Sequence, residues 1–151
     1  MKKKRPFPLY LLCLLHLLLS VSALAAGYSF ITDPDGSGLG INLSYLNRTP
    51  FTSFFLPGLI LFVFNGLFPL FILIGLFFQP KWKFAGILNI YPEKHWSWTY
   101  SLYSGIILIS WIAIQITMVE YFILQPACIG IGLIILILTQ LPSIQKYFSQ
   151  E

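Results

Sequence analysis

Four long apolar runs dominate this sequence, and the polar segments between them are short. The runs cover approximately residues 9–31, 50–78, 97–119 and 121–141. A helix needs about 20 predominantly apolar residues to cross the hydrocarbon core of a bilayer. Because 57% of the residues are hydrophobic and only 9% are charged, a soluble fold of 151 residues could not bury the apolar surface. The sequence therefore predicts an all-α membrane protein, one domain over residues 1–151 with four transmembrane helices in an up-down bundle.

The basic residues mark alternate polar segments. Of the nine Lys and Arg residues, eight lie before the first run, between the second and third, or after the fourth: Lys2, Lys3, Lys4, Arg5, Lys81, Lys83, Lys94 and Lys146. Because cytoplasmic segments retain Lys and Arg, both termini are expected to be cytoplasmic, and Arg48 and Glu120 to lie outside. We expect a bacterial inner-membrane location, with the lipid bilayer as the surroundings. The net charge of +4 follows from this bias, so no nucleic-acid partner is predicted.

The first run has a second interpretation. Residues 1–25 combine a basic start, a Leu-rich stretch and the triplet A-L-A ending at Ala25, which is typical of a cleaved signal peptide. Against cleavage, the apolar stretch continues through Tyr28, Phe30 and Ile31. We favour a retained helix, while cleavage would leave three spans in the same orientation.

The outer loop, which we define as residues 32–58, carries the local motifs. The sequence D-P-D-G-S-G from Asp33 to Gly38 matches the first half of an EF-hand calcium loop. The position that requires a bidentate Glu is Ser44, however, so a calcium site is not supported. We interpret the motif as a turn, in which proline fixes one dihedral angle and glycine adopts a positive φ.

The second half of the loop predicts two helices. Leu39, Leu43 and Leu46 recur at i, i+4 and i+7, the period of a short amphipathic helix on the outer membrane surface. Thr49 and Pro50 then match an N-cap followed by proline at the first helical position. The second membrane helix is therefore expected to begin at Pro50.

Polar side chains inside the apolar runs are few, and each is a functional candidate because hydrocarbon offers it no hydrogen-bond partner. These candidates are His16, Asn65, Gln115 and Gln125. Asn65 and Gln115 lie near the middle of the second and third runs, where side-chain hydrogen bonds can join helices. Cys13 shares a helix face with His16, but two ligands are too few for zinc, so no metal or cofactor is predicted. We interpret these residues as packing contacts, with a ligand or ion site as the alternative.

Three patterns in the second and third runs bear on packing. Pro57 and Pro69 are expected to bend the second helix. Ser97, Ser101 and Gly105 form a small-residue stripe at spacing four, which lets a neighbouring backbone approach. Aromatic residues are expected at the cytoplasmic membrane boundary: Trp82, Tyr91, Trp96, Trp98 and Tyr100.

Several motifs together resemble an uncharacterised family of small bacterial four-helix integral membrane proteins. They are D-P-x-G from Asp33, T-P-F from Thr49, F-L-P-G from Phe55, N-G at Asn65, W-I from Trp111 with Gln115, and L-Q at Leu124. The resemblance covers roughly residues 27–135. It implies a fold, a membrane location and a retained first helix, and it transfers no catalytic residue.

Three hypotheses about function follow. The first is a non-enzymatic accessory protein that presents its outer loop to a membrane-protein partner or to a second copy; its candidate residues are Asp33, Asp35, Gly36, Arg48 and Pro57. The second is a subunit of a small-molecule transporter or channel, based on Asn65, Gln115 and the bent second helix. The third is a membrane redox enzyme, for which Cys13, His16 and Glu120 are the candidates.

Overall fold

The computed structural model describes residues 4–150, and its regular structure over that range is helical. The longer elements are α1 (Phe7–Thr32), α2 (Phe55–Ile60), the π-helix η3 (Leu61–Leu67), α3 (Phe68–Phe78), α4 (Trp96–Met118), α5 (Leu124–Gln140) and α6 (Pro142–Phe148). Three short 3₁₀ turns lie in the loops: η1 (Ser37–Leu39), η2 (Leu43–Leu46) and η4 (Phe84–Gly86).

Three helices are long and apolar enough to cross a membrane. They are Phe7–Thr32, Phe55–Phe78 and Trp96–Met118, of 26, 24 and 23 residues. The pair Leu124–Gln140 and Pro142–Phe148 passes the same test together, with a bend of 63° between its halves, and would be the fourth. The prediction of an all-α protein with membrane-length helices is therefore confirmed.

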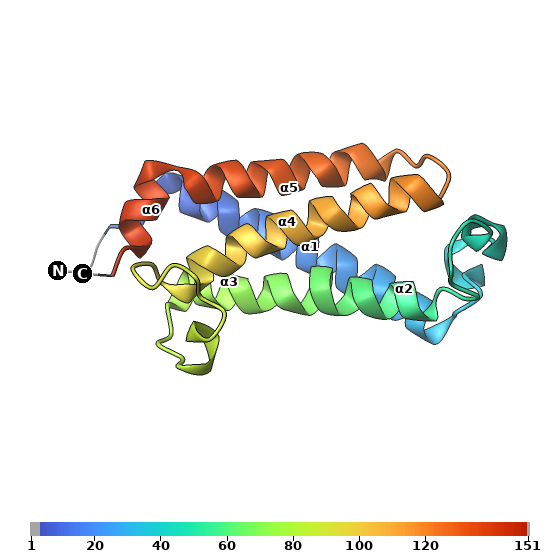
Figure 1. Ribbon diagram of the computed structural model, residues 1–151, viewed down its shortest axis with the longest axis horizontal. Coiled ribbons are helices and arrows are strands. Elements are labelled where there is room, and N and C mark those ends of the chain that lie inside the picture. The colour runs from blue at the N-terminus through green and yellow to red at the C-terminus, as the bar shows by residue number, and fades with distance from the viewer. Residues whose placement is uncertain (1–3, 151) are drawn as a thin grey trace.

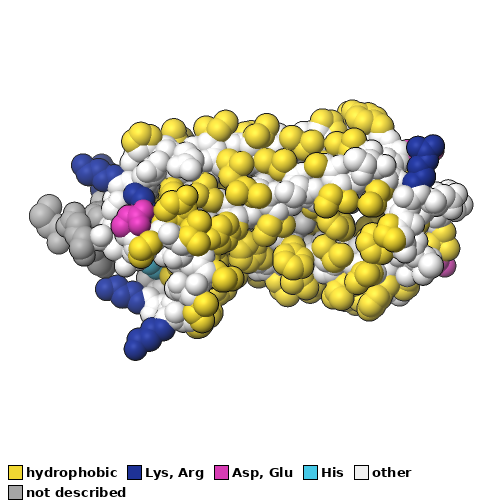
Figure 2. All heavy atoms as spheres, viewed as in Figure 1, with side chains coloured by type: hydrophobic (Ala, Val, Ile, Leu, Met, Phe, Trp, Pro, Cys, Tyr) yellow, Lys and Arg dark blue, Asp and Glu magenta, His cyan; other side chains and the backbone are white. Residues whose placement is uncertain are grey.

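The helices lie alongside one another in an elongated molecule (Figure 1). α1 packs against α2, η3 and α3, whereas α4 packs mainly against α5 and also against α3. Residues 33–54 lie at one end, and the loop between α3 and α4 lies at the other with α6 and the beginning of α1 (Figure 1). Figure 2 shows a mainly apolar middle with the Lys and Arg side chains at the two ends. We call the end that holds α6 the terminal end.

The predicted amphipathic helix in the outer loop is wrong. The structure has two separate 3₁₀ turns there, because Gly40 between them adopts a left-handed conformation with φ of 66°. Leu46 is buried, whereas Leu39 and Leu43 are 44% and 41% exposed, so the three leucines do not share one apolar face.

The second membrane helix begins at Phe55 and not at the predicted Pro50. The Thr49 hydroxyl donates to the Leu46 carbonyl at 2.9 Å and accepts from the Phe51 N–H at 3.2 Å. The Phe54 N–H donates to the Pro34 carbonyl at 2.8 Å. Thr49 therefore closes a turn of the loop, and this cross-loop bond holds the chain non-helical up to Phe54.

The two prolines of the second span each lie near the start of a helical segment. Pro57 lies in the first turn of α2, where a missing N–H leaves no helical bond unmade. Pro69 is the second residue of α3, which directly follows the π-helix η3. In a regular α-helix its ring would clash with the Asn65 carbonyl, and the wider π turns before it avoid this clash. The chain remains one helical span of 24 residues over Phe55–Phe78.

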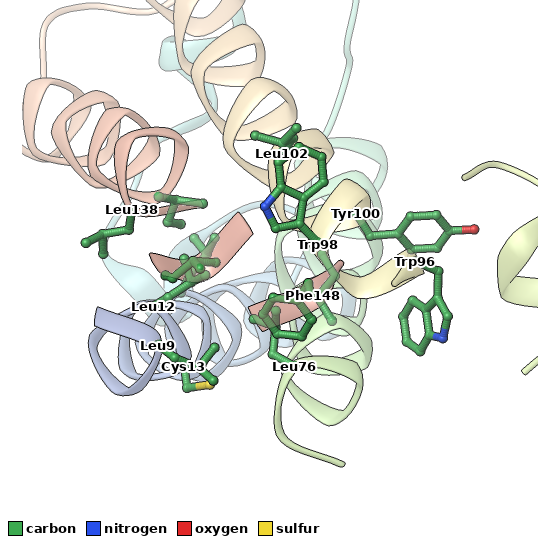
Figure 3. Close-up of a cluster of buried hydrophobic side chains, with 14 of the residues drawn as sticks. Leu9, Leu12, Cys13, Leu76, Trp96, Trp98, Tyr100, Leu102, Leu138 and Phe148 are labelled. Carbon is green, nitrogen blue, oxygen red and sulfur yellow. The ribbon is translucent and has the colours of Figure 1, made fainter. Parts of the chain in front are cut away.

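The largest apolar cluster lies toward the terminal end and draws side chains from α1, α3, α4, α5 and α6 (Figure 3). Trp96, Trp98 and Tyr100 belong to it and are only 3%, 3% and 6% exposed. These three side chains therefore face protein neighbours and not the outside of the molecule, since neighbouring elements cover the first turns of α4. Trp82 and Tyr91 are more exposed, at 36% and 38%.

Candidate functional site

Six polar side chains are buried in the interior of the membrane helices, and we call them the polar cluster. They are His16 and Ser20 of α1, Asn65 of η3, Ser101 and Ser104 of α4 and Thr139 of α5. Each is at most 1% exposed. Hydrogen bonds or single helical turns connect five of them, and Asn65 directly precedes Gly66, whose carbonyl accepts from Ser20.

A directed chain of hydrogen bonds joins three helices within this cluster. The Thr139 hydroxyl donates to the Ile135 carbonyl at 2.7 Å, which leaves its oxygen as an acceptor for Ser101 at 2.9 Å. The Ser101 hydroxyl therefore donates to Thr139 and accepts from Nε2 of His16 at 2.8 Å. This direction places the ring proton of neutral His16 on Nε2 and leaves Nδ1 as an acceptor. Within residues 4–150, that Nδ1 has no hydrogen-bond partner.

Asn65 is the most unusual member of the cluster. Both its side-chain oxygen and its side-chain nitrogen are buried without a hydrogen-bond partner among the described residues. The hydroxyl of Ser104 is likewise unpartnered there, whereas Ser20 donates to the Gly66 carbonyl at 2.8 Å. A buried polar group without a partner costs about 1–3 kcal/mol. Such a cost, within a π-helical segment, is typical of a functional position rather than of optimised packing.

Two predicted polar residues lie elsewhere. Gln115 is half-buried on α4 and makes no side-chain hydrogen bond within the described range. Gln125 lies in the first turn of α5, where its Oε1 accepts from the Phe122 N–H at 3.2 Å. The expected interhelical bonds from Asn65 and Gln115 are therefore absent from residues 4–150, and Ser101 and Thr139 make the joining contacts instead. In the sequence, the small-residue stripe that includes Ser101 was the pattern that could have indicated these joining contacts.

No metal centre emerges from the described residues. Within residues 4–150, no group of three His, Cys, Asp or Glu side chains lies close enough to hold a metal ion. Cys13, which shares a helix with His16, is 9% exposed and packs in the apolar cluster (Figure 3).

The outer loop contains a tightly bonded turn. The Asp33 carboxylate accepts from the Ser37 hydroxyl at 3.0 Å and from the Gly38 N–H. The Gly36 N–H donates to the Asp33 carbonyl at 3.0 Å, and Gly36 adopts φ of 80°. Hydrogen bonding with the Asp33 carboxyl and with Ser37 lowers the pKa of Asp35. The Asp33 carboxylate is thus engaged by the loop itself.

The loop is anchored to the helices by aromatic packing. The rings of Phe30 and Phe54 stack with centroids 4.9 Å apart. A Cβ atom at Gly36 would lie 3.0 Å from the Phe54 ring and 2.7 Å from the Ile41 carbonyl, so only glycine fits. Beyond this anchor a hollow of about 350 Å³ is lined by Asp35, Ser37, Gly40, Ile41, Asn42 and Leu43.

The two other candidate residues of the outer loop do not belong to this turn. Arg48 is exposed beyond the turn, and Pro57 belongs to α2.

His95 organises the terminal end. Its Nδ1 accepts from the Ser97 N–H at 3.3 Å and caps α4, while its Nε2–H donates to the Pro80 carbonyl at 3.1 Å. Its backbone N–H donates to the Phe148 carbonyl at 2.9 Å, so the α3–α4 loop, α4 and α6 meet at this residue. Burial lowers the pKa of the His95 imidazole, and the nearby charge of Lys81 lowers it further.

Comparisons with protein-family models, with curated proteins and with solved structures found no match.

Proposed function

We propose that this chain is a non-enzymatic accessory protein of a bacterial inner membrane that presents its outer loop to a membrane-protein partner or to a second copy. In this proposal the four apolar helices span the bilayer as an up-down bundle, both termini are cytoplasmic, and α1 is retained. The chain would then belong to the family of small four-helix membrane proteins that it resembles. The packing of α1 against α2, η3 and α3 supports its retention.

The observation that carries the proposal is the ordering of the outer loop. The Asp33 turn, the Phe30–Phe54 stack and the Phe54–Pro34 backbone bond hold its backbone in one conformation. The loop nevertheless leaves Leu39 and Leu43 more than 40% exposed beside the hollow. A partner that binds a preordered apolar surface does not have to offset the entropy of ordering the loop.

Site-specific photo-crosslinking in intact cells tests this proposal. A photoreactive amino acid at Leu43 should give one discrete adduct with a membrane protein or with a second copy. The matched control is Tyr121, which is 73% exposed in the α4–α5 connection. A Gly36→Val substitution, which forces the turn apart, should abolish the Leu43 adduct. The proposal fails if Leu43 gives no adduct, or if Leu43 and Tyr121 give the same products.

The polar cluster favours a second candidate, a subunit of a small-molecule transporter or channel. Asn65 and Nδ1 of His16 are unpartnered inside the helices of residues 4–150, so they could bind a small polar solute. Solute uptake should fall in cells carrying Asn65→Leu, with Gln115→Leu as a matched control on the half-buried side of α4. Unchanged uptake profiles in Asn65→Leu cells would remove this candidate.

A further inference from the structure

A cationic, aromatic-walled pocket lies at the terminal end, in the loop between α3 and α4. It has a volume of about 320 Å³, and the lining residues that bear on binding are Lys81, Trp82, Lys83, Asn89, Trp96 and Gln150. The pocket therefore combines two ammonium groups with aromatic walls and side-chain amides. None of these residues belongs to the polar cluster or to the outer loop.

The two lysines of the pocket have no acidic partner within residues 4–150. Lys81 and Lys83 are exposed, and neither forms an ion pair with a described carboxylate. Glu93 is the single acidic residue between Asp35 and Glu120 in the sequence, and it too forms no ion pair across residues 4–150. An anion is consequently the ligand that the pocket attracts.

Packing holds the pocket in shape. The Trp82 ring stacks on Phe71, Phe84 and Trp96 with centroid distances of 5.5, 5.5 and 5.7 Å. This stack fixes the backbone between the two lysines. Asn89 donates to the Lys94 carbonyl at 2.9 Å and accepts from the Thr99 hydroxyl, which anchors the opposite wall to α4.

Strongly exposed apolar side chains lie in the same loop as the cationic pocket. Phe84, Ile87, Leu88 and Ile90 are 61%, 80%, 64% and 66% exposed in the same loop. The loop directly connects two membrane-length helices, so this surface lies where headgroups meet acyl chains. A free anion would leave these four side chains in water. An amphipathic anion matches both the lysines and the apolar surface.

We propose that this pocket binds the phosphate headgroup of an anionic phospholipid, with Lys81 and Lys83 on the phosphate and the acyl chains over Ile87, Leu88 and Ile90. The inference concerns a lipid ligand at the terminal end. It is independent of any partner of the outer loop.

The test is native mass spectrometry of the full chain in a neutral detergent with equal amounts of dioleoylphosphatidylglycerol and dioleoylphosphatidylcholine. In neutral micelles there is no charged membrane surface, so retained lipid reports a local site. Phosphatidylglycerol should be retained preferentially. A Lys81→Gln/Lys83→Gln double variant should lose that preference by about tenfold or more, because charge-assisted bonds to phosphate are being removed. Both lysines are exposed, and an unchanged circular dichroism spectrum would verify folding.

A matched double variant separates a local site from diffuse attraction. Lys4→Gln/Lys146→Gln removes the same amount of charge from the terminal end of the molecule and should keep the preference for phosphatidylglycerol. Equal losses in the two double variants would overturn the pocket assignment. Inorganic phosphate in millimolar excess should not displace the lipid. Full displacement by phosphate, or equal retention of both lipids by the unmodified chain, would overturn the lipid assignment.

Discussion

Ser101 connects three helices through one hydroxyl group. It accepts from His16 and donates to Thr139, and it is fully buried. Ser101→Ala would leave the His16 Nε2–H without an acceptor, so we expect a loss of about 0.5–2 kcal/mol in unfolding free energy. The midpoint of thermal unfolding in detergent should fall by a few degrees.

The control for this prediction is on the same helix. Ser110→Ala makes the same chemical change at an exposed position of α4 and should leave the midpoint unchanged. Equal midpoints for the two variants would contradict the role of Ser101.

His95 predicts a pH dependence of stability. Because burial lowers the pKa of folded His95, the unfolded chain binds a proton more readily than the folded chain. Its contribution to stability is complete above the ordinary histidine pKa and is lost as pH falls through the depressed folded pKa. Protonation of Nδ1 also removes the acceptor that caps α4. We expect the thermal midpoint to drop between about pH 7 and pH 5.

A variant without a titratable side chain at this position isolates the effect of His95. Asn at position 95 still accepts a hydrogen bond at a helix N-cap but does not titrate. His95→Asn should therefore show a shallower decline over the same pH range. Parallel curves for the two proteins would assign the pH dependence elsewhere.

Sequence patterns located His16 and Asn65 but not their surroundings. Helical periodicity reports which residues share a face of one helix, and it contains no information on which residue of another helix lies opposite. The His16–Ser101–Thr139 chain depends on the relative rotation of α1, α4 and α5, which packing of all three helices determines. The position of Gln125 was missed for a local reason, since α5 begins three residues later than the apolar run.

At the scale of elements, Gly75 fixes the spacing of α3 and α4. A Cβ atom there would lie 2.6 Å from the Ser97 Cβ and would also meet the Trp96 ring. Gly75→Ala should push the helices apart and cost about 1–3 kcal/mol, as overpacking does. Gly130→Ala on α5 meets nothing within 4 Å and should stabilise the chain by about 0.4–1 kcal/mol. The measurement is the midpoint of thermal unfolding of the two variants in detergent. A Gly75→Ala midpoint at or above that of Gly130→Ala would refute the close approach of α3 and α4 at Gly75.

Element boundaries show where local signals compete with tertiary contacts. The third span was predicted as residues 97–119 and is Trp96–Met118, because nothing near its ends competes with helix formation. The second was predicted from Thr49 and Pro50, yet Thr49 bonds to Leu46 and Phe54 bonds to Pro34 across the loop. The N-cap pattern contains no information on that cross-loop bond. The π-helix before Pro69 likewise depends on the surrounding packing, since proline in a helix can also cause a kink.

At the scale of the whole molecule, apolar length was sufficient to predict helical content and the candidate spans. Composition could not show that Trp96, Trp98 and Tyr100 face inward. The interfacial rule concerns depth along the membrane normal, and it does not specify whether lipid or protein surrounds an aromatic side chain. The loop and α6 cover them, and both are short elements whose packing follows from the assembled bundle.

The distribution of basic residues makes a prediction about orientation. The loop between α3 and α4 carries Lys81, Lys83 and Lys94, and it lies at the same end as α6 (Figure 1). Because these charges resist translocation, we expect that end in the cytoplasm and the outer loop outside. A fluorescent protein fused after Glu151 should fluoresce, and alkaline phosphatase inserted within residues 38–47 should be active. The reverse pattern of reporter activity would contradict this orientation. Separately, a mature N-terminus at Ala26 would reduce the number of spans to three.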